Sequence, residues 1–172
     1  MFMKYIIKNK FFSLGESSLV YDENNEVAFK AKGSVFSNII TRFHKKIIRD
    51  KNGKKLFVVR NKFWHKPFYK SAIIFEKRKK LATVSNSHLV KNGYDVVGAT
   101  KPISIEGKGW NLQIKLGDEI IGRIEPPNID SIKDVVKSVT DTYILEVFDE
   151  QDVPFLVAMM IAIDNIHDQK MK

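Results

Sequence analysis

Four consecutive cations, Lys77, Arg78, Lys79 and Lys80, form the densest group of chemically distinctive side chains in the sequence. They lie between two segments of strand-like composition, so a hairpin tip would hold all four charges in solvent. Clustered cations of this kind bind phosphate groups or the headgroups of anionic lipids, and each basic residue near such a surface contributes about 1 kcal/mol. The alternative is a solvated tip whose lysines prevent edge-to-edge aggregation.

Two further groups extend the candidate anion site. Lys45, Lys46, Lys54 and Lys55 would join the tip if their strands lie nearby. Trp64 and Lys66 belong to the stretch 62–70, which interleaves four aromatic residues with three lysines. Aromatic rings at a membrane prefer the interface, and on single-stranded nucleic acid they stack on bases. The alternative is a long hairpin that packs its rings against the protein wall and turns its lysines outward.

The basic character of the chain belongs to its central third. The net charge is +9, but residues 42–91 alone carry 16 Lys and Arg against two acids, whereas residues 92–172 carry eight against 14. A local field of this sign attracts anionic lipid, nucleic acid or an acidic protein. The acidic last third and the lack of a nucleic-acid motif count against nucleic acid.

Residue types that support catalysis or metal binding are sparse. The chain has no cysteine, and its four histidines are scattered with no spacing typical of metal ligands. Asp164 and Asp168 lie one helical turn apart, either as a surface pair at a helix end or with Asp164 hydrogen-bonded where the helix leaves the core. No nucleophile elbow or phosphate-binding loop is present. The sequence therefore predicts no catalytic residue, no metal site and no cofactor, and it favours a protein that is not an enzyme.

Most of the chain reads as short strands separated by turns at intervals typical of an all-β barrel or sandwich. Asp22 and Asp50 each begin a polar turn that leads into a new apolar segment, which predicts repeated hairpins. We expect strands at residues 4–8, 26–32, 45–49, 55–60, 71–76, 81–84, 94–97, 103–106, 110–116, 119–125 and 143–148.

The last element is an apolar run from Val153 to Ile163 that predicts a helix over about 153–168. Asp152 is the expected N-cap, and Pro154 suits the first turn. Eleven residues rise only ~16 Å as a helix, against ~30 Å for the hydrocarbon core of a bilayer, so the run is too short to span one. A helix that is apolar on every face must be enclosed by protein. We expect the strands to surround it and to leave no lumen for an enclosed ligand.

The order of these pieces resembles the LURP-one-related family of the tubby C-terminal-like superfamily. The resemblance rests on the opening segment YIIKNKFFSLG from Tyr5 to Gly15, on the hairpins at Asp22 and Asp50, and on the acidic turn, apolar helix and Asp164 near the end. It implies one domain over residues 1–172, folded as a closed, roughly twelve-stranded antiparallel barrel around a central C-terminal hydrophobic helix. Tubby domains bind phosphorylated inositol lipids through basic residues on the barrel, which implies a similar activity here.

Together these observations predict a non-enzymatic binding module that docks on anionic phospholipid or phosphoinositide headgroups through a basic outer face. An interaction with an acidic protein is the alternative, and nucleic-acid binding ranks third. The absence of cysteine and of a convincing secretory signal fits a cytoplasmic protein that is peripheral to the membrane when bound, with no transmembrane segment.

Overall fold

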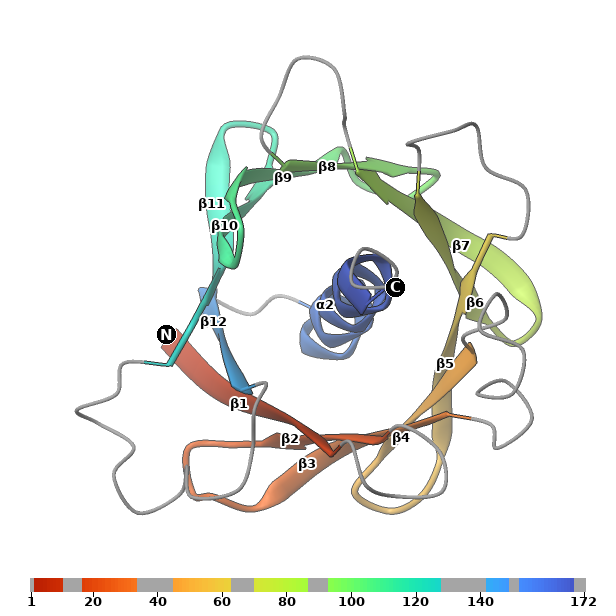
Figure 1. The fold of residues 1–172 in the computed structure, drawn as a ribbon, viewed down its shortest axis with the longest axis vertical. Helices are drawn as coiled ribbons and strands as arrows, with labels where there is room; N and C mark the ends of the chain where they lie inside the picture. The colour runs from red at the N-terminus through yellow and green to blue at the C-terminus, as the bar shows by residue number, and fades with distance from the viewer. Residues whose placement is uncertain are drawn as a thin grey trace.

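Twelve antiparallel strands form a closed barrel in the computed structural model, which describes residues 2–10, 17–33, 45–62, 70–86, 93–127, 142–148 and 152–168. Each strand pairs with its neighbours in sequence, and β1 closes the ring on β12 (Figure 1). The barrel predicted from the sequence is confirmed, whereas the assignment of residues 1–172 to one domain stays a prediction. The strands are β1 (Phe2–Lys10), β2 (Ser17–Tyr21), β3 (Val27–Gly33), β4 (Lys45–Asp50), β5 (Lys55–Asn61), β6 (Ser71–Glu76), β7 (Lys79–Asn86), β8 (Gly93–Val97), β9 (Ile103–Lys108), β10 (Asn111–Leu116), β11 (Glu119–Glu125) and β12 (Thr142–Phe148).

The helix α2 (Val153–Asp168) runs through the interior of this barrel, as the apolar run predicts (Figure 1). Its N-cap is Asp152, whose side-chain Oδ1 accepts a hydrogen bond from the backbone N–H of Phe155 at 3.1 Å. Every side chain from Phe155 to Ile166 is buried, including those on both sides of the helix. A helix that is apolar all round is stable here because the strands exclude water from its whole circumference.

The helix lies closer to one side of the barrel than to the other. It contacts β5, β6 and β7 most extensively, where the wall includes the small inward side chains of Ala72 and Ala82. On the far side the inward positions carry large side chains, among them Ile114 and Leu145. Small residues allow the helix to approach the wall closely, and large ones fill the remaining space at the density of a protein interior.

The two ends of the barrel differ. At the end where α2 begins, the described turns are short, and they join β2 to β3, β4 to β5, β6 to β7, β8 to β9, and β10 to β11. We call this the hairpin end. At the end where α2 finishes, the loop end, β9 and β10 are joined by a short turn, and the other connections between strands span six to sixteen residues of sequence.

One strand was not predicted. β2 covers Ser17–Tyr21, a segment with only two aliphatic residues, Leu19 and Val20. Ser18 and Val20 point inward and are buried, so the alternation of a strand is present. The segment is too short and too polar for its composition to indicate a strand, and its place is determined by pairing with β1 and β3.

The enclosure of α2 can be tested by truncating one buried side chain. Ile161→Ala should lower the free energy of unfolding by about 2–5 kcal/mol, because Ile161 is fully buried in the middle of the helix. Val97→Ala, at a side chain that is 64% exposed, should change it by less than about 0.5 kcal/mol. Urea unfolding of both variants measures the difference, and equal effects would contradict a helix enclosed by the barrel.

Candidate functional site

The hairpin between β6 and β7 has a two-residue turn made of Lys77 and Arg78. The strand register pairs Glu76 with Lys79, and φ is 43° at Lys77 and 71° at Arg78. Two positive φ values in a two-residue hairpin define a type I′ turn, for which Asn-Gly is strongly preferred. The left-handed conformation costs an ordinary residue roughly 1–2 kcal/mol. Lys77 and Arg78 therefore make this turn less stable than Asn-Gly would.

The neighbouring hairpin, between β4 and β5, has a turn organised by Asp50. The Oδ1 atom of Asp50 accepts hydrogen bonds from the backbone N–H groups of Asn52 at 3.0 Å and Lys54 at 2.9 Å. Gly53 takes the left-handed position, with φ of 83°, where it has no steric penalty. The two hairpins are adjacent because β5 pairs with β6.

These two turns and the strand ends next to them carry eight exposed cations, which we call the cationic hairpins. Arg49 donates a hydrogen bond to the carbonyl of Gly53 at 2.9 Å, so its side chain closes over its own turn. In the part of the chain that the structure describes, none of the eight forms an ion pair with a carboxylate. The members are Arg49, Lys51, Lys54, Lys55, Lys77, Arg78, Lys79 and Lys80.

Acidic residues lie in other turns of the hairpin end, together with the exposed Lys101 between β8 and β9. The turn between β2 and β3 carries Asp22, Glu23 and Glu26, and the turn between β10 and β11 is followed by Glu119. Asp22 organises its turn as Asp50 does, accepting hydrogen bonds from the N–H groups of Asn24 and Glu26. The cationic hairpins therefore form a basic arc, and the acidic turns lie elsewhere around the ring.

The other predicted anion-binding residues do not join the cationic hairpins. Lys45 is exposed but begins β4 at the loop end, at the other end of the barrel from Lys77 and Arg78. Trp64 and Lys66 lie outside the described residues, and the flanking positions, Lys62 and Lys70, are also at the loop end. The structure thus separates candidates that the sequence analysis grouped together.

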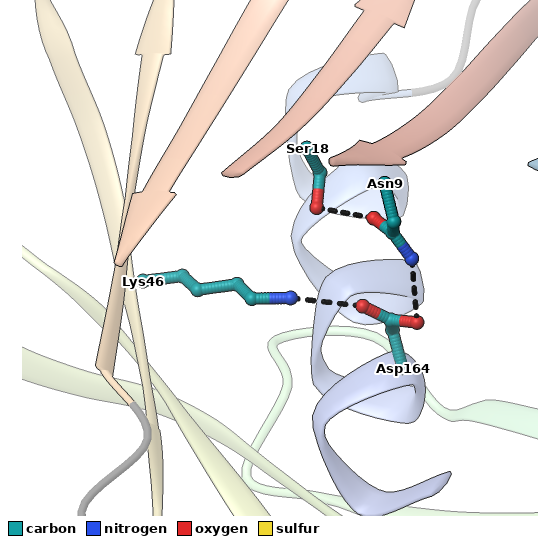
Figure 2. Close-up of polar contacts among 4 residues, drawn as sticks. All are labelled: Asn9, Ser18, Lys46 and Asp164. Atoms are coloured by element: carbon teal, nitrogen blue, oxygen red, sulfur yellow. Dashed lines mark hydrogen bonds and ion pairs between the residues drawn. The ribbon is translucent and has the colours of Figure 1, made fainter. Parts of the chain in front are cut away.

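The predicted place of Lys46 at an outer anion-binding site is wrong, because its side chain points into the barrel. Its Nζ lies 2.9 Å from Oδ2 of Asp164 on α2, and both side chains are 3% exposed (Figure 2). An ammonium group buried in this way does not reach an outer anionic surface. The sequence signal for its burial was the alternation of β4, in which Lys46 shares the inward face with Ile48.

Asp164 is the centre of a buried polar network rather than part of a surface pair. Its Oδ1 accepts a hydrogen bond from Nδ2 of Asn9 at 3.0 Å, and Oδ1 of Asn9 accepts one from Ser18 Oγ at 2.5 Å (Figure 2). The side chains come from α2, β1, β2 and β4. Because a buried carboxylate is costly unless its oxygens are paired, these bonds fix the position of α2 along the barrel.

A second contact holds the end of α2. The hydroxyl of Tyr94 lies 2.6 Å from Nε2 of His167, and the ring of Trp110 stacks on His167 and on Tyr143, with centroid distances of 4.6 and 3.7 Å. Burial raises the pKa of the Tyr94 hydroxyl, so the phenol stays protonated and can donate to the imidazole. This cluster was not predicted from the sequence, since its members are far apart in the chain.

The family model described as LURP-one-related matches residues 3–164, nearly the whole chain. The chain belongs to the LURP-one-related family. No curated protein and no solved structure gives a significant match. The match includes both cationic hairpins, the buried network and most of the enclosed helix of this LURP-one-related protein.

A hollow of about 90 Å³ lies at the hairpin end of this LURP-one-related barrel, between the connection of β8 to β9 and the first turn of α2. Its lining residues are Ala99, Thr100, Lys101, Ile103, Ile121, Asp152, Phe155 and Leu156.

No group of three or more His, Asp or Glu side chains among the described residues is arranged to hold a metal ion. Within the same residues, no helix has both the length and the apolar character needed to cross a bilayer.

The buried pair between Lys46 and Asp164 makes a double-mutant prediction. Lys46→Met should lower the free energy of unfolding by about 3–5 kcal/mol, because it leaves the carboxylate of Asp164 buried without its cation. Adding Asp164→Leu should restore most of that loss, since neither charge then remains inside the barrel. Urea unfolding of the two single variants and the double variant measures the coupling, and additive losses would show that the two side chains do not interact.

Proposed function

We propose that this protein is a non-enzymatic binding module that docks on anionic phospholipid bilayers through the cationic hairpins. The observation that carries the proposal is the turn at Lys77 and Arg78, where both cations are held with positive φ. Residues in sparsely populated backbone conformations are retained against a stability cost, and such positions concentrate at binding and catalytic sites. A turn needed only to reverse the chain would gain stability from Asn-Gly.

The surroundings of the turn support an anionic partner of large area. All eight cations are exposed on two adjacent hairpins, so a flat surface can meet many of them at once. At about 1 kcal/mol for each basic residue near an anionic membrane, a subset is enough for reversible attachment. The separation of the basic arc from the acidic turns orients the barrel, because only the basic arc is attracted.

The enclosed helix also favours a partner outside the barrel. The interior is occupied by α2 and by inward side chains of the wall, so binding is expected on the outer surface or at the turns. Attachment of this kind is that of a cytoplasmic protein that becomes peripheral to the membrane when bound. The contribution of Trp64 and Lys66 stays a prediction from sequence.

Vesicle flotation with charge-reversed variants tests the proposal. The protein should float with vesicles containing phosphatidylserine or phosphoinositide and not with neutral ones, and binding should fall as salt rises. The variant with Lys77, Arg78, Lys79 and Lys80 all changed to Glu should lose this binding. The matched control changes four exposed lysines of the loop end to Glu, with the same change in net charge: Lys32, Lys45, Lys62 and Lys108.

The control decides how the result is read. Loss of binding in the hairpin variant alone would locate the membrane face at the hairpin end. Equal loss in both variants would mean that net charge, and not the cationic hairpins, drives attachment. If the unmodified protein binds no anionic vesicle, the proposal fails and an acidic protein becomes the partner to seek.

A second prediction separates the charge of the turn from its backbone strain. Lys77→Asn with Arg78→Gly should raise the free energy of unfolding by about 1–2 kcal/mol, because both new residues accept positive φ, and should weaken anionic-vesicle binding. Lys79→Gln with Lys80→Gln removes the same charge from positions without positive φ, and should weaken binding with no gain in stability. Urea unfolding and flotation of both double variants provide the comparison. A turn variant that is less stable than the parent would contradict the strain argument.

A further inference from the structure

Next to the cationic hairpins, the outer wall of the barrel carries a row of apolar side chains. The inward positions of β5 are Phe57 and Val59, so Val58 points outward, and its register partner on β6 is Phe75. Ile73 of β6 pairs with Thr83 of β7, and Thr83 pairs with Val97 of β8. We define the apolar row as Val58, Ile73, Phe75 and Val97.

Val97 is the most exposed member of the row, and Val58, Ile73 and Phe75 are partly exposed. Val97 is 64% exposed, and it is one of two large apolar side chains that are exposed in the described part of the chain. The outward positions of the next two strands differ from those of the row. Their outward positions in β9 and β10 are polar: Ser104, Glu106, Lys108, Asn111, Gln113 and Lys115.

Cations border the apolar row. The guanidinium carbon of Arg60 lies 5.1 Å from the centre of the Phe75 ring, so a charge rests on the row itself. Beyond Phe75, Glu76 ends β6 and Lys79 begins β7, and the two flank the turn of Lys77 and Arg78. Aromatic and aliphatic side chains surrounded by Arg and Lys are typical of surfaces that lie at the boundary between headgroups and acyl chains.

We propose that the apolar row enters the acyl-chain boundary of the same anionic bilayer that the cationic hairpins bind. This inference rests on the proposed function and adds to it that the flank of β5 to β8, and not the turns alone, faces the lipid. Apolar transfer out of water is not screened by ions, whereas the attraction of exposed charges is. The row therefore predicts a fraction of membrane binding that resists salt.

The absence of cysteine from the chain makes a direct test possible. Val97→Cys places a single thiol on the row, where it can be labelled with an environment-sensitive nitrobenzoxadiazole fluorophore. On anionic vesicles the emission should shift to the blue, and it should lose intensity when the acyl chains carry bromine, which quenches by contact.

The matched control uses the other exposed apolar side chain. Phe2 is 51% exposed, lies at the hairpin end in β1, and is separated by several strands from β7 and β8 in either direction around the ring. The fluorophore at Phe2→Cys should show neither the blue shift nor the loss of intensity. Equal quenching at both positions would overturn the row as the inserted surface.

A second measurement requires no label. Val97→Asp should remove the fraction of protein that floats with anionic vesicles at high salt and should leave most of the low-salt binding in place. Because Val97 is exposed, the substitution is not expected to unfold the barrel.

The outcomes distinguish this inference from the proposed function. Flotation without quenching at position 97 would overturn the inserted row while leaving attachment by the cationic hairpins in place. Absence of flotation at low salt would remove both. Quenching at position 97 alone, together with loss of the salt-resistant fraction in Val97→Asp, would establish the apolar row as a membrane contact.

Discussion

The structure depends on the burial of one helix that is apolar on every side. Such a helix cannot rest on a sheet, because half of its surface would remain in water. A ring of twelve strands satisfies this condition and also removes the exposed strand edges that an open sheet would have. The same arrangement fills the described interior with side chains from α2 and the wall.

Burial alone would let an apolar helix slide or rotate, since hydrophobic attraction has no direction. The described interior is polar only toward the loop end. Lys46, Asp164, Asn9 and Ser18 link α2 to three strands there, and His167 meets Tyr94 at the same end. Hydrogen bonds and ion pairs have fixed geometry, so these contacts determine the register that the apolar contacts leave open. The buried polar residues at this end are Ser18, Lys46, Asn61, Ser71, Ser85, Asn86, Thr142, Asp164 and Asn165.

Short-range sequence patterns were sufficient to predict the helix, its cap and two hairpin turns, because these features depend mainly on residues close together in the chain. The run from Val153 to Ile163, the cap at Asp152 and the turns at Asp22 and Asp50 are all present as expected. β2 was missed because its five residues become a strand only through their partners. Lys46 lies inside the barrel, contrary to the prediction, because the alternation of β4 places it on the inward face with Ile48.

The candidate site shows a different limit. Lys45 and Lys77 belong to the same basic third of the sequence, yet they lie at opposite ends of the barrel because successive strands run in opposite directions. A net charge counted over a stretch of sequence adds residues from both ends of the barrel and cannot assign them to one end. Knowledge of the strand order would have been enough to separate these cations. A charge at the start of β4 and one at the end of β6 necessarily lie at opposite ends of the barrel.

The turns of the hairpin end differ in how they reach left-handed backbone conformations. Asp22 and Asp50 accept the N–H groups of their own turns, and Gly53 supplies a left-handed position without strain. The same chain therefore contains a stable way to reverse a strand, with cations beside the turn and not in it. At Lys77 and Arg78 the chain instead uses a strained turn, although an Asn-Gly turn would fit between Glu76 and Lys79. Solubility needs only exposed charge, which the Asp50 turn already provides at no backbone cost. The folding of the hairpin does not require this strained turn, and the proposed docking of the cationic hairpins gives a reason for it.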